Sequence, residues 1–93
     1  MLKFELGQVV QTRTIANEIE NDKQFEKEVA EAFTKYVNCN WGDTHAEDKK
    51  LNDNAVKNND DRIVAKYITS KGDIFIITEY DRSYTTIMFA NEY

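Results

Sequence analysis

Ninety-three residues are enough for one small domain and too few for two. Apolar residues make up 41% of the chain and aromatic residues 12%, enough to close one core, which argues against a disordered protein. The single cysteine, Cys39, cannot form an internal disulfide, and the apolar runs are too short to span a bilayer. We therefore expect one cytosolic domain without a membrane partner.

The net charge of −5 is unevenly placed. Residues 17–60 carry six basic and eleven acidic groups, while the charges of the two flanking segments cancel. An acidic balance argues against direct nucleic-acid binding, because a phosphate backbone attracts lysine and arginine. It favours a basic protein partner, or it serves solubility alone.

The first part of the chain predicts a strand followed by two helices. β-Branched residues between Phe4 and Arg13 favour an extended segment, in which Gly7 marks a bulge or a bend. Residues 14–21 predict a short helix. Apolar residues then recur at helical spacing, so we expect the longest helix at about residues 22–38.

Two capping boxes are expected at helix starts. Asn21 and Gln24 fit the pattern at the start of the longest helix, and Thr44 and Glu47 fit it at the start of a third helix that ends near Asn58. That third helix has few apolar residues, so we expect it at the periphery of the domain.

The last third of the chain predicts three strands joined by turns, at residues 63–69, 74–80 and 84–89. The predicted fold class is α+β: an N-terminal strand, two or three helices, and a three-stranded antiparallel meander in one sheet packed on the helices. Six apolar residues are expected to meet in the core: Phe25, Val29, Phe33, Ile74, Ile76 and Ile87.

The opening residues and two groups of motifs stand out together: Gly7–Val10 and Thr12-Arg13; Trp41-Gly42-Asp43, Glu47-Asp48-Lys49, Asn52-Asp53 and Ala55; and Ile76–Glu79, Asp81–Ser83, Thr85-Thr86, Phe89 and Glu92-Tyr93. They resemble a known family over nearly the whole chain. The family consists of small, uncharacterised proteins carried on bacterial plasmids, conjugative elements and phages. The sequence departs from the family's pattern at Thr14, Asp60, Phe75 and Ala90, which affects turn details more than the fold.

This resemblance supplies no catalytic residues and implies a genetic context instead. Mobile elements carry small accessory proteins that counter CRISPR or restriction defences of the host. The resemblance therefore implies an anti-CRISPR role in the bacterial cytoplasm, by association and not by chemistry.

Two loops contain candidate interaction residues. An exposed Trp41 beside Asp43 would anchor an interface; alternatively, Trp41 closes the core and Asp43 accepts local backbone hydrogen bonds. The second loop would expose Arg82 for recognition, with Tyr80 and Tyr84 beside it as aromatic rings that stack on bases. Alternatively, it is a hairpin turn in which Asp81 or Ser83 bonds nearby backbone and Arg82 meets a carboxylate.

Metal binding and catalysis are poorly supported. Cys39 and His45 are the only residues of their kinds, whereas a structural zinc site needs four ligands, usually cysteines and histidines. The sequence has no nucleophile elbow and no phosphate-binding glycine loop. We therefore expect a protein that is not an enzyme and that needs no metal or other cofactor.

The preferred hypothesis is a stoichiometric inhibitor that occupies a basic nucleic-acid groove on a CRISPR–Cas effector or surveillance complex, acting as a monomer or small homo-oligomer. The alternatives are a small metal-dependent or hydrolytic enzyme that uses Cys39, His45 and nearby acids, and a plasmid-maintenance adaptor. Alternatively, the acidic helices serve only solubility. The candidate partner-binding residues are Glu18, Glu20, Asp22, Glu26, Trp41, Asp43, Glu47 and Asp48.

Overall fold

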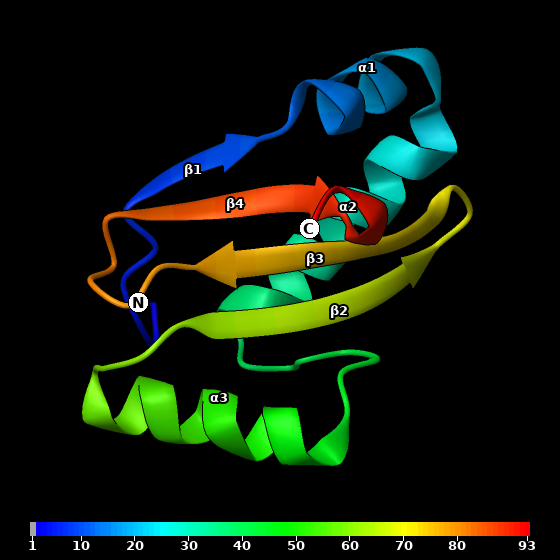
Figure 1. Cartoon of the computed structure of the whole chain (residues 1–93). Coiled ribbons are helices and arrows are strands. Elements are labelled where there is room, and N and C mark those ends of the chain that lie inside the picture. Colours follow the sequence, from blue (N-terminus) through cyan, green and yellow to red (C-terminus); the bar gives the residue numbers. More distant parts are fainter. Residues whose placement is uncertain (1) are drawn as a thin grey trace.

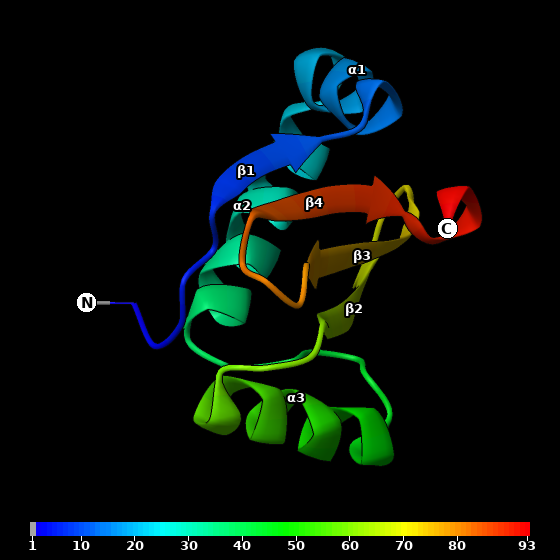
Figure 2. The same cartoon turned by 60° about the vertical axis from the view of Figure 1, so that its left-hand side comes forward.

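Residues 2–93, which the computed structural model describes, form one four-stranded sheet and three α-helices (Figure 1). The longest helix, α2, lies across one face of the sheet, and α3 lies alongside the sheet next to β2 (Figure 1, Figure 2). In chain order the elements are β1 (Gln8–Gln11), α1 (Arg13–Asn21), α2 (Lys23–Val37), α3 (Ala46–Asn58), β2 (Ile63–Thr69), β3 (Gly72–Thr78), β4 (Tyr84–Phe89) and the 3₁₀ helix η1 (Ala90–Glu92).

The predicted α+β class is confirmed, and the pairing of the sheet differs from a simple meander at one strand. Strands β2, β3 and β4 pair antiparallel in succession, whereas β1 pairs parallel with β4, placing Gln8 opposite Tyr84. The sheet is therefore mixed, with the order β1-β4-β3-β2.

Strand β1 is shorter than the predicted extended segment because the chain bends at Gly7. This residue has φ of 63°, in the left-handed region, and a Cβ atom there would collide with the carbonyl group of Ser83. The bend takes residues 2–6 out of the strand pairing, which begins at Gln8.

The predicted cap of α2 was wrong by one residue. Asp22 is the N-cap, and its carboxylate accepts hydrogen bonds from the amides of Gln24 at 2.9 Å and Phe25 at 3.1 Å. Asn21 is instead the last residue of α1, where its side chain donates to the Asn17 carbonyl at 2.9 Å. The two helices thus meet at a single residue.

The capping box predicted for α3 was also wrong. Its N-cap residue is His45, whose side chain makes no capping hydrogen bond. The hydroxyl group of Thr44 donates to the Trp41 carbonyl and accepts the amide of Lys66 at 2.9 Å. Because Thr44 is engaged by strand β2, it is not available to cap the helix.

The core lies between α2 and the sheet. Phe25 and Tyr36 of α2 are completely buried, and the ring of Phe25 stacks on Phe89 with 5.5 Å between centroids. Five of the six predicted core residues are buried, but Phe33 is only half-buried and packs at the margin. Within residues 2–93, every helix is too short or too polar to cross a membrane.

A chain of hydroxyl groups crosses this core. Thr85 Oγ1 donates to the Leu6 carbonyl at 2.7 Å and lies 2.8 Å from Thr78 Oγ1, which lies 2.6 Å from the Tyr36 hydroxyl. Because a carbonyl can only accept, the donors run in one direction, from Tyr36 through Thr78 to Thr85. Burial raises the pKa of Tyr36, which keeps its hydroxyl protonated as the first donor.

Candidate functional site

The Trp41-Gly42-Asp43 loop and α3 together cover the outer edge of β2. The Asp43 amide donates to the Lys66 carbonyl at 2.9 Å, and its carboxylate accepts the Ile68 amide at 3.0 Å. The Asn52 side chain of α3 bonds both the amide and the carbonyl of Val64, at 3.2 and 2.9 Å. We call this covered side of β2 the sealed edge; its backbone groups are not open to another strand.

Trp41 belongs to the core. Its side chain is only 3% exposed, and it packs against the rings of Phe4 and Tyr36. Its indole Nε1 donates to the carboxylate of Asp53 at 2.8 Å. Of the two alternatives for this residue, the structure shows the one in which Trp41 closes the core, and the ring offers almost no surface to a partner.

Arg82, in the loop between β3 and β4, is also buried. Arg82 is 7% exposed, and its guanidinium donates to five backbone carbonyls and to no carboxylate within residues 2–93. Arg82 is therefore not displayed for recognition, and the expected carboxylate partner was wrong. The carbonyls belong to Ala55, Asp60, Asp61, Glu79 and Tyr80.

Glu18 of α1 and Asp22, the N-cap of α2, lie near a lysine from the β2–β3 turn. Lys71 Nζ lies 3.3 Å from Asp22 and 4.0 Å from Glu18. The Phe25 amide, with help from Lys71, lowers the pKa of Asp22. Glu20 and Glu26 are exposed and have no ion pair or side-chain hydrogen bond within residues 2–93.

The acids of α3 lie at the other end of the molecule. Glu47 and Asp48 stand exposed in the first helical turn, where a negative charge interacts favourably with the helix dipole. They have no ion pair within the described residues. Figure 1 places α1 beyond the β1 edge of the sheet and α3 beyond the β2 edge, so the eight predicted partner-binding residues are divided between two ends of the molecule.

A groove of about 510 Å³ lies between α3 and the adjoining strands. Most of the surface that its walls expose is apolar, although seven of its ten lining residues are polar or charged. One of these seven is Asp48 of α3. Nothing in the sequence marked this groove, because its apolar residues come from elements that pair only in the folded chain. The lining consists of Thr44, His45, Asp48, Leu51, Asn52, Asp61, Arg62, Val64, Lys66 and Phe75.

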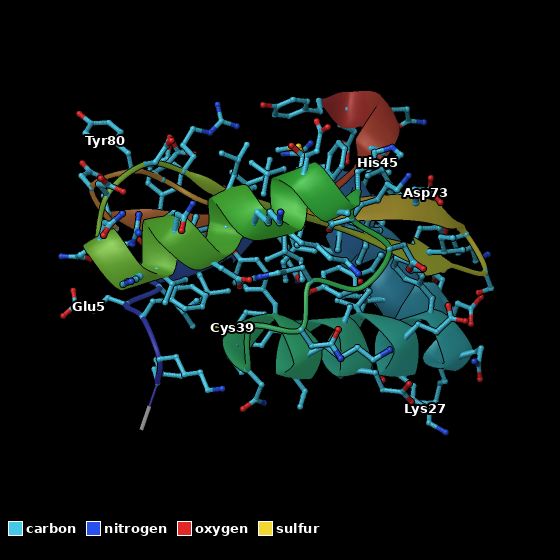
Figure 3. All side chains as sticks on the ribbon, turned by 90° about the horizontal axis from the view of Figure 1, so that it is seen from below. Glu5, Lys27, Cys39, His45, Asp73 and Tyr80 are labelled. Atoms are coloured by element: carbon cyan, nitrogen blue, oxygen red, sulfur yellow. The ribbon has the colours of Figure 1, made fainter. Side chains whose placement is uncertain are left out.

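Cys39 and His45 do not meet. Figure 3 shows them apart, with Cys39 just after α2 and His45 at the start of α3. Among residues 2–93 there is no cluster of three or more His, Cys, Asp or Glu side chains arranged to hold a metal ion. Burial raises the pKa of Cys39, which favours the thiol over the metal-binding thiolate.

Several residues of the motifs quoted from the sequence make contacts that hold the fold. Trp41 donates a hydrogen bond to Asp53, and Asp43 and Asn52 bond to the backbone of the sealed edge. Arg82 donates to main-chain carbonyls of the neighbouring loops and of α3. Sequence analysis had assigned no role to Asn52, although it lies in one of the quoted motifs. Comparison with known protein families, curated proteins and solved structures finds no match to this chain.

Proposed function

We propose that this chain is a mobile-element-encoded inhibitor that binds a CRISPR–Cas complex in the host cytoplasm and blocks its nucleic-acid groove. The structural observation that supports the proposal concerns four of the predicted partner-binding acids, which are exposed and have no ion pair within residues 2–93. They are Glu20 and Glu26 at one end of the molecule and Glu47 and Asp48 at the other. The family resemblance supplies the genetic context.

The physical basis is electrostatic. A chain with a net charge of −5 is steered toward a basic groove and is repelled by nucleic acid, so it competes for the groove without binding the nucleic acid itself. Carboxylates that bond to other groups of the protein are less available to a partner, which removes Glu18, Asp22 and Asp43 from the preferred contact set.

The α3 end is the preferred contact surface. Asp48 lines the groove together with Leu51 and Phe75, and Glu47 precedes it in the first turn of α3, so this end offers negative charge next to apolar surface. Protein interfaces combine an apolar centre with a polar rim in this way. Neither this groove nor a second cavity, which includes Leu2, Glu5 and Val56, is lined by Glu20 or Glu26.

Paired charge changes at the two ends test the proposal. Purified CRISPR–Cas complexes of several types would be titrated with the wild type, with Glu47→Gln/Asp48→Asn and with Glu20→Gln/Glu26→Gln. We expect a fixed stoichiometry of inhibition, weaker binding at higher salt, and a larger loss for the α3 pair. The second pair is the matched control because it removes the same charge.

Three outcomes would contradict the proposal. The first is the absence of binding to every complex tested. The second is equal inhibition by all three proteins with no salt dependence. The third is turnover at amounts far below stoichiometric that is lost on chelation or in His45→Ala, which supports the metal-dependent enzyme instead.

A further inference from the structure

The two outer edges of the sheet differ. The outer edge of β2 is the sealed edge, whereas β1 has neighbours on one side only. The amides of Gln8 and Thr12 donate to Ser83 and Ile87 of the β4 side. Because backbone groups alternate in direction along a strand, the amides and carbonyls of Val9 and Gln11 point away from β4. Within residues 2–93 they have no hydrogen-bond partner.

The open edge also lacks the usual protection. All four residues of β1 are exposed, with Val9 at 45% and Val10 at 37%. Residues 6–12 carry no charge and no proline, in a chain of which 31% of residues are charged. Proteins normally protect such edges with lysine, proline, a bulge or a covering loop. This edge is therefore ready to pair with another strand.

We infer that the occupant of this edge is β1 of a second copy of the chain, paired antiparallel about a two-fold axis. Outward-facing residues must meet outward-facing residues, which places Val9 opposite the partner's Gln11 and lets each such pair exchange both backbone hydrogen bonds. Val10 then lies opposite its own copy on the axis, as an apolar pair.

The absence of charge in residues 6–12 favours a second copy over an unrelated strand. In a two-fold contact, a charged residue near the axis faces the same charge of its copy, which costs stability. An uncharged segment avoids this repulsion. The pairing joins the two sheets into one, whereas the sealed edges stay at the far ends and stop further growth.

The paired strands are short, so the dimer should be weak, and it should become stronger as the salt concentration rises. Strand β1 has only four residues, so the interface is much smaller than that of a permanent dimer. Each copy carries a net charge of −5, and salt screens the repulsion between them. Dimerisation thus strengthens as salt rises, whereas binding to a basic groove weakens. The two proposals therefore fail independently.

Light scattering and sedimentation over a range of concentrations test the dimer. We expect the mass to rise from 10.9 kDa toward twice that value, and the amides of Val9 and Gln11 to gain hydrogen-exchange protection at high concentration. Val10→Lys should weaken association about tenfold or more, because two lysines then face each other. Val9→Pro removes only an outward-facing amide and should also weaken it.

Ile68→Lys is the matched control, since it adds the same charge at an exposed residue of the sealed edge, 65% exposed, and should leave association unchanged. A mass that stays at 10.9 kDa up to about 1 mM would overturn the inference, since even weak interfaces associate there. So would a dimer broken by Ile68→Lys and not by Val10→Lys. If Val9→Pro fails to fold, the comparison of Val10→Lys with Ile68→Lys and the hydrogen-exchange data on the wild type still test the dimer.

Discussion

The guanidinium of Arg82 is expected to be the most important single polar group for stability. Hydrogen bonds to a charged donor contribute about 1.5–3 kcal/mol each, but burying the charge costs several kcal/mol, and contacts in one network are not additive. Several of its acceptor carbonyls belong to exposed residues, and water can replace the lost donor there. We therefore expect Arg82→Met to cost about 3 kcal/mol, of the 5–15 kcal/mol typical for a domain.

Urea unfolding followed by circular dichroism measures this loss. Methionine keeps an unbranched side chain and does not relieve the left-handed φ of 60° at this position, so the comparison isolates the guanidinium. Arg82→Lys should recover part of the loss, because an ammonium group has three donors. Arg62→Met is the control: Arg62 is exposed and donates one hydrogen bond at 2.6 Å, to the Tyr93 hydroxyl. Equal midpoints for Arg82→Met and Arg62→Met would refute the reasoning.

Four further predictions follow from the same structure. Asn52→Ala should cost about 1–3 kcal/mol and increase concentration-dependent light scattering, because it exposes Val64 on the sealed edge. Phe25→Ala should cost about 3–5 kcal/mol and the half-buried Phe33→Ala clearly less, as measured by urea unfolding. The Phe25 amide lowers the pKa of Asp22, and the Ser70 hydroxyl lowers the pKa of Glu28. Both carboxylates therefore stabilise the fold at a pH above their unfolded-state pKa values of 3.8 and 4.5, and this stability is lost as the pH falls below those values. Replacing both residues, Asp22→Ala with Glu28→Ala, should flatten this acidic part of the curve when the unfolding midpoint is measured against pH. Cys39→Ser and His45→Ala should leave the midpoint nearly unchanged, and stoichiometric zinc in protein purified without added metal would contradict this.

Local patterns predicted the elements well because their causes are local. Helical spacing of apolar residues located α2 to within about a residue at each end, since one amphipathic face must meet the core. The caps were harder to predict, because neighbouring polar residues compete for the same amides. Asp22 displaced Asn21 at the start of α2, and strand β2 took the hydroxyl of Thr44.

Contacts between residues far apart in the chain could not be predicted from the sequence. Arg82 was expected to meet a carboxylate, yet its acceptors are main-chain carbonyls, which every residue has and no pattern distinguishes. The direction of β1 relative to β4 depends on the path of three intervening helices. The sequence identified the acidic residues but not where they lie on the surface, because only the folded structure shows that α1 and α3 are at different ends of the molecule (Figure 1).

The parallel pairing of β1 with β4 has a consequence for the order in which the protein folds. Gln8 meets Tyr84 only after almost the whole chain has closed into a loop, which is entropically costly and slow. The β2–β3–β4 meander closes through short turns and has no such delay. Strand β1 should therefore join the sheet last, so substitutions that loosen it should accelerate unfolding while leaving the refolding rate almost unchanged.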